Sequence, residues 1–325
     1  MPLMSNFTIS LCMTTPDGPT LEHALSQTPF CPPEGIETFR QGWAPISKQD
    51  VLPVQFTEHI EGLNATRCLF KHGAKKVPPS VLNEAAANEV KRIEDKEGRK
   101  VGRKERAQIK EQVRDTLLID IFPTVTATNV LVFHTSIRHT SSDESNLTFL
   151  FIEGNEKARD RVFSQLVADL RDKIALRIWT PKNSLRSAMT EWLHNDESVP
   201  ALLGVGNRCK IKGSGDCAPV STFNNEDLSR SFVQEQLDQG RTVESMELCF
   251  RIPDDIRSKE AALYESEWDA SFVLSADGSF SKTTSLSVDH SILSETFGDT
   301  ADFYMAGFLM RELAEYLTEE LQGLA

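Results

Sequence analysis

The feature that most constrains this fold is a highly charged stretch without proline that follows Pro79 and runs to about Leu118. It is rich in Glu, Lys, Arg, Ala and Val, most of which favour helix, and Ser80 stands where a helix N-cap would. The stretch therefore predicts one long helix. Gly98 and Gly102 each cost ~1 kcal/mol relative to alanine inside a helix, so two helices with a bend near them are the alternative.

The same region holds the chain's positive charge. Residues 71–114 contain 13 Lys and Arg against 7 Asp and Glu, whereas the whole 325-residue chain has 35 against 48 and a net charge of −13. A net negative protein is a poor ligand for nucleic acid unless its cations are gathered in one place, because affinity for phosphates comes from clustered Lys and Arg. In this chain the excess of positive charge lies in residues 71–114, and the excess of negative charge lies in the rest of the sequence.

In a single helix over residues 92–114, seven cations fall within ~80° of arc, because their spacings are three or four residues. They are Arg92, Lys96, Arg99, Arg103, Arg106, Lys110 and Arg114. This spacing predicts one cationic ridge that binds the backbone of nucleic acid or another polyanion. The competing interpretation is a solvated helix face held by Glu–Lys pairs one turn apart.

The flanking sequence has the mixed periodicities of an α+β protein. Helices are expected at 21–26, 155–175, 185–194, 226–239 and 302–321, and strands at 125–135 and 147–152, with a hairpin over 271–286 that turns at Asp277-Gly278. Residues 204–225 contain several glycines and are expected to form turns. Successive subregions are expected at 1–76, 77–122, 123–203, 204–245 and 246–325.

Several kinds of chemistry lack their sequence signatures. The Gly204-Val205-Gly206 and Gly213-Ser214-Gly215 segments complete no nucleotide-binding motif, and the cysteines and histidines lack zinc-ligand spacing. The acidic pair after Pro253 does not continue into a nuclease-type metal site. We expect no catalytic residues, no metal and no cofactor. The chain also lacks an apolar run of membrane-spanning length and a signal peptide, so a cytoplasmic location is expected.

Eight short motifs, in order along the chain, resemble those of the RdgC family of bacterial and phage recombination-associated proteins. They are PFCP at 29–32, GWAP at 42–45, VPPSVL at 77–82, LL at 117–118 with Phe122, MTEWL at 189–193, EDL at 226–228 before GR at 240–241, FVL at 272–274 before DGS at 277–279, and ADF at 301–303. The resemblance runs from end to end of the chain.

The resemblance implies a mixed α+β subunit that pairs into a ring-shaped homodimer around double-stranded DNA. It further implies binding without sequence preference, no catalysis, a nucleoid-associated location and restraint of RecA by occupation of duplex DNA. An acidic exterior with a basic lining would reconcile the net charge with DNA binding. Phe122 matches the family's dimer-interface phenylalanine, although an ordinary core position is the alternative.

The candidate DNA-binding residues are therefore the cations of the basic region: Lys71, Lys75, Lys76, Arg92, Lys96, Arg99, Lys100, Arg103, Lys104, Arg106, Lys110 and Arg114. Where the family carries a basic finger, this chain has no cation, and the equivalent loop contains Thr222, Asn224, Asn225 and Glu226. This loss motivates a second hypothesis, in which the chain is a protein-interaction module of recombination with reduced DNA affinity.

Overall fold

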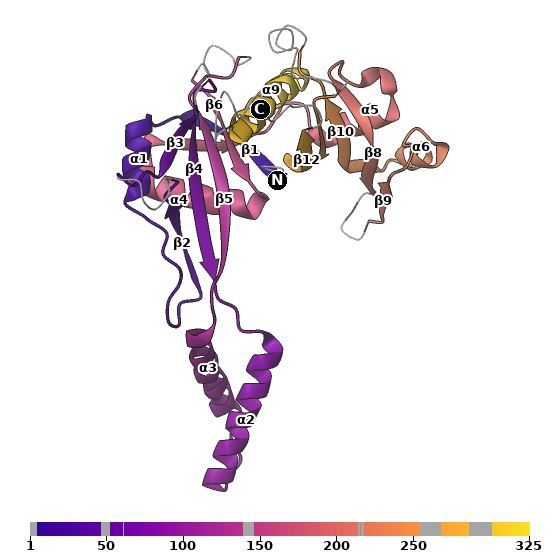
Figure 1. The fold of residues 1–325 in the computed structure, drawn as a ribbon. Helices are drawn as coiled ribbons and strands as arrows, with labels where there is room; N and C mark the ends of the chain where they lie inside the picture. Colours follow the sequence, from indigo (N-terminus) through magenta and orange to yellow (C-terminus); the bar gives the residue numbers. More distant parts are fainter. Residues whose placement is uncertain are drawn as a thin grey trace. The chain divides into compact units, whose positions relative to one another are not determined.

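The computed structural model describes residues 5–46, 53–60, 62–138, 146–213, 215, 218–253, 268–285 and 301–325. The chain forms two compact units, each built from separate segments: the first from Met1–Ala24, Thr57–Cys68 and Asn129–Ala325, the second from Leu25–Phe56 and Leu69–Thr128. Strands and helices mix in the described residues (Figure 1), which confirms the predicted α+β class.

The first unit contains an antiparallel sheet with the strand order β5-β6-β1-β12-β11-β10-β8-β9, in which β7 also pairs with β1. The strands are β1 (Phe7–Thr14), β5 (Thr124–Phe133), β6 (Thr148–Glu153), β7 (Ala175–Ile178), β8 (Leu203–Lys212), β9 (Val220–Asn224), β10 (Thr242–Phe250), β11 (Ala270–Ser275) and β12 (Ser279–Ser285). Strand β3 (Thr57–Ile60) pairs with the start of β4 (Ala65–Ala74), which continues into the second unit.

Aromatic side chains fill the core of this unit. Phe7 stacks on Phe280 at 4.6 Å between ring centroids, and Phe151 meets Phe7 and Phe133 edge to face. Helix α9 (Ala301–Glu320) buries most of its surface, and Gly307 lies so close to Leu63 that a Cβ would approach its Cδ1 to 2.8 Å. Such contacts hold a core through buried apolar area and close packing.

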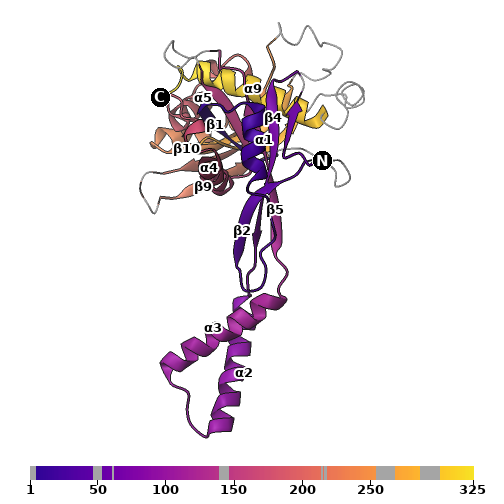
Figure 2. The same ribbon diagram turned by 90° about the vertical axis from the view of Figure 1, so that its left-hand side faces the viewer.

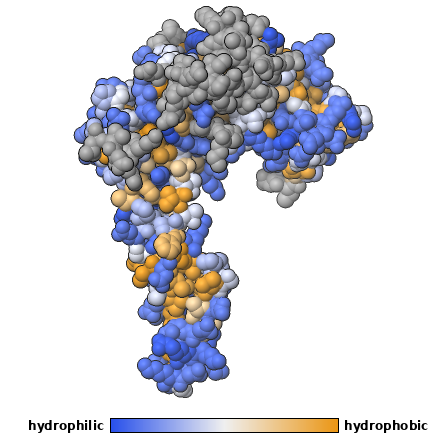
Figure 3. Space-filling model, in the orientation of Figure 1, coloured by the Kyte–Doolittle hydropathy of each residue, from blue (hydrophilic) through white to orange (hydrophobic). Residues whose placement is uncertain are grey.

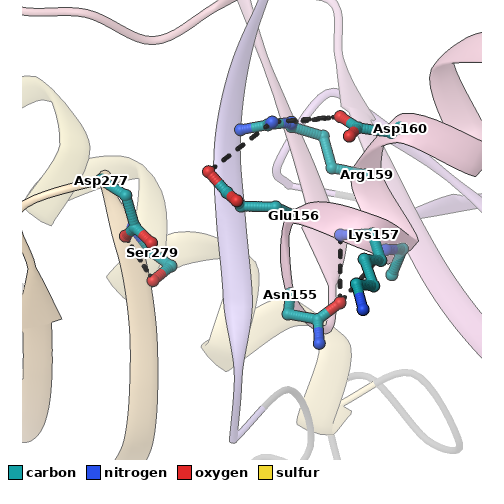
Figure 4. A network of polar contacts seen from close by, with 8 residues as sticks. Asn155, Glu156, Lys157, Arg159, Asp160, Asp277 and Ser279 are labelled. Atoms are coloured by element: carbon teal, nitrogen blue, oxygen red, sulfur yellow. Dashed lines mark hydrogen bonds and ion pairs between the residues drawn. The ribbon is translucent and has the colours of Figure 1, made fainter. Parts of the chain in front are cut away.

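The other helices of this unit are α4 (Glu156–Leu170), α5 (Leu185–His194) and α6 (Ser231–Asp238), with 3-10 turns at Arg171–Lys173 and Asp196–Ser198. Figure 4 shows how α4 begins: the Asn155 Oδ1 accepts hydrogen bonds from the backbone N–H groups of Lys157 and Ala158. This is an N-cap, which satisfies amide donors that have no partner within the helix. α1 (Gly18–Ser26) begins in the first unit, and its last two residues belong to the second unit.

The second unit combines a β-ribbon with two helices. β2 (Phe39–Ala44) pairs with the end of β4 from Phe39↔Ala74 to Ala44↔Leu69, and the Trp43 ring packs against Phe70 at 5.3 Å. The ribbon leads into α2 (Pro79–Glu97), which is followed by α3 (Arg103–Asp120). Figures 1 and 2 show α2 and α3 as a helical hairpin: α3 returns toward the ribbon, and Figure 2 shows that the two helices are inclined to each other and spread apart toward the turn that joins them.

The single long helix predicted over residues 79–118 is therefore wrong, and the alternative with two helices is correct. Gly98 adopts the left-handed conformation with φ +64° and donates its N–H to the Glu94 carbonyl, which ends α2. Only glycine adopts this conformation without strain, so the turn begins there. Nor is Ser80 the N-cap: α2 starts after Pro78, which has no capping side chain, with proline in its first turn.

Residues 204–225 were also expected to form turns, and this prediction is wrong. They contain most of β8 and all of β9, because β8 pairs with both β10 and β9 and is thereby held in the sheet. The hairpin at Asp277-Gly278 is confirmed, with Gly278 at φ +79° between β11 and β12. No described helix is long and apolar enough to cross a membrane.

The two glycines of the turn between α2 and α3 offer a matched test of why the chain reverses there. Gly98 has φ +64° and Gly102 has φ −74°, and a Cβ at either would meet nothing within 4 Å, so only backbone conformation distinguishes them. We expect Gly98→Ala to destabilise the hairpin by ~1 kcal/mol and raise amide exchange over residues 79–120 about fivefold. Gly102→Ala should stay within ~0.5 kcal/mol of the wild type, because the stiffer unfolded chain offsets a weaker N-cap. Equal exchange in the two variants, measured by mass spectrometry, would contradict the role of Gly98.

Candidate nucleic-acid interface

Most of the predicted basic residues lie on the α2–α3 hairpin; Lys71 lies on β4, and Lys75 and Lys76 lie in the segment between β4 and α2. Because the chain reverses at residues 98–102, the basic residues do not form the single ridge predicted from one helix, and that prediction is wrong. Arg92 and Lys96 lie on α2, Arg99 and Lys100 lie in the turn, and the remaining five lie on α3: Arg103, Lys104, Arg106, Lys110 and Arg114. The far end of the hairpin is hydrophilic in Figure 3.

Several arginines of the hairpin are paired with carboxylates of the hairpin itself. Arg99 forms two short hydrogen bonds to Glu105, at 2.6 and 2.7 Å, and also contacts Glu97. The hydrogen bonds that Arg99 donates to Glu105 raise the pKa of the Arg99 guanidinium above its ordinary value, and the same contact lowers the pKa of Glu105. The other pairs are Arg92–Glu89, Arg106–Glu94, Arg114–Glu111 and Arg114–Asp115.

A second group of cations has no such partner. Lys71, Lys76, Lys96, Lys100, Arg103 and Lys104 make no ion pair and no side-chain hydrogen bond within the described residues, and all but the half-buried Lys71 are exposed. Lys96, Lys100, Arg103 and Lys104 gather at the turn end of the hairpin. We call these four the tip cations. Lys110 instead donates to the Asn83 side chain at 2.8 Å.

Lys75 differs from all other candidates because its side chain is buried. Only 6% of the residue is exposed, and Nζ donates to the backbone carbonyls of Gly35 at 3.0 Å and Leu118 at 3.1 Å. Leu118 lies in the last turn of α3, where carbonyl groups have no partner within the helix. The Lys75 ammonium therefore links α3 to the loop at Gly35 and is not exposed to solvent.

Lys75, Lys76 and Arg114 also line an apolar cavity of about 580 Å³, together with Leu82 and Leu118. Figure 3 shows apolar surface on the part of the hairpin nearer the strands. Phe122 is 92% exposed, so the alternative that it is a core residue is excluded. The other large apolar side chains of this unit that are exposed were not predicted from the sequence; they are Ile36, Phe39, Val54, Val81, Ile119 and Val125.

The finger-equivalent residues belong to the first unit and carry no positive charge. Thr222 and Asn224 lie on β9 and are not in a loop, Asn225 has φ +55°, and the Glu226 amide donates to the Asn207 carbonyl. Glu226 also pairs with Arg230 at 3.6 Å. A polar cavity of about 560 Å³ lies beside Asn225 and Glu226, with Arg208 and Glu247 in its wall.

The described residues contain no cluster of three or more His, Cys, Asp or Glu that could hold a metal ion. The acidic pair at Asp254 and Asp255 that was weighed as a nuclease site lies outside the described residues. The hairpin, residues 79–120, carries ten lysines and arginines together with nine aspartates and glutamates.

Known proteins resemble this chain over most of its length. The family model described as "Putative exonuclease, RdgC" matches residues 6–256. The chain is 27% identical over 239 residues to the recombination-associated protein RdgC of Neisseria meningitidis (serogroup C, strain FAM18), and 28% identical over 239 residues to that of Laribacter hongkongensis, with 73% of both chains covered in each case. The protein of the same name from Burkholderia orbicola is 27% identical over 227 residues, which cover 70% of this chain and 67% of its own. The family model spans well over half of the sequence, and the chain therefore belongs to the RdgC family, as the order of its motifs indicates.

Proposed function

We propose that this chain binds double-stranded DNA without sequence preference and restrains RecA-dependent homologous recombination by occupying the duplex. The observation that carries the proposal is the α2–α3 hairpin, whose tip cations Lys96, Lys100, Arg103 and Lys104 are exposed and without ion pairs in the described residues. Cations of this kind neutralise phosphates and release counterions on binding. A protein that covers DNA in this way would be associated with the nucleoid.

The contact is proposed to be with the DNA backbone and not with base edges. Lysine acts as a point charge toward phosphate, and three of the four tip cations are lysines. The paired arginines, such as Arg99 and Arg106, can exchange a carboxylate for a phosphate, but each exchange leaves a carboxylate without its partner. They therefore contribute less to affinity than the tip cations do.

We further propose that the subunit forms a ring-shaped homodimer through the apolar surface around Phe122. An aromatic side chain that is 92% exposed, with Ile119 and Val125 exposed beside it in the sequence, has the character of an interface and not of a solvated surface. The relatives' shared name supports the recombination part of the proposal, since each is called a recombination-associated protein.

A second candidate function is a protein-interaction module of recombination. It is favoured by the finger-equivalent segment, which has no cation from Thr222 to Asp227 and places Glu226 and Asp227 at the wall of the polar cavity. Under this hypothesis an acidic surface contacts a recombination protein directly. The two candidates differ in whether DNA is needed for the effect.

The first prediction concerns binding to DNA. Fluorescence anisotropy with a labelled 30-base-pair duplex should show binding at 50 mM salt, and affinity should fall steeply as salt rises, with a log–log slope of about −4 per protomer if the tip cations each neutralise one phosphate. The variant Lys100→Glu/Arg103→Glu/Lys104→Glu should lose binding. The matched control Lys157→Glu/Lys173→Glu/Lys182→Glu makes the same charge change on exposed residues of the first unit and should lose far less.

If the control loses as much as the tip variant, the binding surface is not the hairpin. No binding of the wild type at 50 mM salt would refute the DNA-binding proposal. The duplex should also remain intact with magnesium or manganese present. Its degradation would instead support the exonuclease activity that the family description names.

The second prediction concerns self-association. Phe122→Ala removes most of the exposed aromatic surface, so sedimentation equilibrium should show a monomer where the wild type is a dimer. Val167→Ala, which shortens a side chain that is 49% exposed on α4, is the control and should leave the mass unchanged. A wild-type monomer at micromolar concentration, or a dimeric Phe122→Ala variant, would refute the proposed interface.

The third prediction separates the two candidate functions. Wild-type protein should slow RecA-driven strand exchange on a linear duplex, and the triple tip variant should not, because inhibition requires occupation of the DNA. Under the second candidate, the tip variant would still inhibit, and RecA would be retained by the immobilised protein after nuclease treatment. Retention that disappears with nuclease would favour the DNA-dependent mechanism.

A further inference from the structure

One carboxylate, that of Glu94, joins α2 to both the turn and α3. A single oxygen of Glu94, Oε1, accepts a hydrogen bond from the Val101 backbone N–H at 2.9 Å and another from Arg106 Nη2 at 3.3 Å. Glu94 lies in the last turn of α2, Val101 lies in the turn and Arg106 lies in α3. The side chain therefore joins the three parts of the hairpin's end. The bond from Val101 is the main reason that the pKa of Glu94 lies below its ordinary value.

A second side chain, Arg99, also spans this turn: it bonds to Glu97 and Glu105, whereas Glu94 bonds to the backbone of the turn. The turn begins at Gly98 and ends at Gly102, and glycine loses more conformational freedom on ordering than any other residue. Gly98 is fixed by its N–H bond to the Glu94 carbonyl, and Arg106 donates its backbone N–H to the Gly102 carbonyl. Between these bonds, Val101 is 95% buried and its amide is committed to Glu94.

The tip cations lie around this turn. Lys96 precedes it, Lys100 is adjacent to Val101, and Arg103 and Lys104 begin α3. Their relative positions consequently depend on the conformation of residues 98–102. A disordered turn would keep the same charges but spread them over many arrangements, and the affinity for a phosphate backbone would fall in proportion to the fraction that is competent to bind.

We propose that Glu94 is a positioning residue for polyanion binding, so that removing its hydrogen-bonding side chain weakens the binding of DNA. This inference rests on the proposed function. Its sign is opposite to the simple electrostatic expectation, in which deleting any carboxylate near a phosphate-binding surface reduces repulsion and strengthens binding. The hydrogen bond to Val101, and not the charge, is what Glu94 supplies.

Three variants separate the bond from the charge. Glu94→Ala removes both. Glu94→Gln removes the charge but keeps an oxygen that can accept from the Val101 amide. Asp95→Ala removes the charge of the neighbouring carboxylate, which is exposed and has no ion pair or side-chain hydrogen bond in the described residues. All three change the net charge by the same amount, so long-range electrostatics affects them similarly.

The variants are compared by anisotropy on the 30-base-pair duplex at 50 mM salt, with the full-length protein. We expect Glu94→Gln and Asp95→Ala to bind about twofold more tightly than wild type, because one nearby repulsion is lost. Glu94→Ala should bind about fivefold more weakly, as it would if the competent fraction of turn conformations fell to about one fifth. Hydrogen exchange over residues 98–106 should accelerate in Glu94→Ala alone.

Each result decides the matter. Tighter binding by Glu94→Ala, equal to that of Asp95→Ala, would overturn the positioning role while leaving the proposed DNA binding intact. Weaker binding by both Glu94→Ala and Glu94→Gln would show that the charge is required, and would also overturn it. If wild type fails to bind duplex at 50 mM salt, the proposed function fails and this inference fails with it. Far-UV circular dichroism confirms that α2 and α3 remain folded in each variant.

Discussion

The reversal of the chain at residues 98–102 determines how the whole basic segment is presented. Because Gly98 takes the left-handed conformation, α2 ends there, and α3 returns beside it with the opposite direction. Acidic side chains at the end of one helix then reach cations at the start of the other, as Glu94 reaches Arg106. In a continuous helix these two residues, twelve positions apart, would be separated by ~18 Å along the axis. Because of this turn, some cations of the region are paired with carboxylates of the hairpin, and the tip cations stay exposed.

Elements whose signals lie within their own sequence could be predicted. Helix α5 occupies residues 185–194 as expected, since its apolar face has helical spacing and is complete within ten residues. The β11–β12 hairpin was likewise predictable from Asp277-Gly278. Strands β8 and β9 were missed because glycines at 204 and 206 weaken any local strand preference. β8 is held by pairing with β10, and β9 by pairing with β8; such distant partners cannot be recognised from a local window.

Some features of the candidate site could likewise be predicted from the sequence, and others could not. Charge and spacing identified the basic region, but they could not distinguish Lys75, whose ammonium binds two carbonyls, from Lys100, which is exposed with no partner in the described residues. Burial depends on the loop at Gly35, forty residues away in sequence. Phe122 shows the converse. The sequence allowed Phe122 a core position or an interface position equally, and its exposure of 92% excludes the core position. In both cases the sequence does not show whether a distant segment covers the side chain.

In the proposed function, the acidic residues of the hairpin have two kinds of effect on a bound polyanion. Those without a structural contact, such as Asp95, act only through repulsion. Those that order the turn or hold an arginine also decide where the remaining cations lie, as Glu94 and Glu105 do. A surface made of unpaired lysines alone would be more positive but less ordered, because like charges repel and glycine turns are flexible. In the proposed function, binding without sequence preference requires no contact to a base, so a small set of ordered cations is sufficient, and the net charge of −13 across the chain does not oppose it.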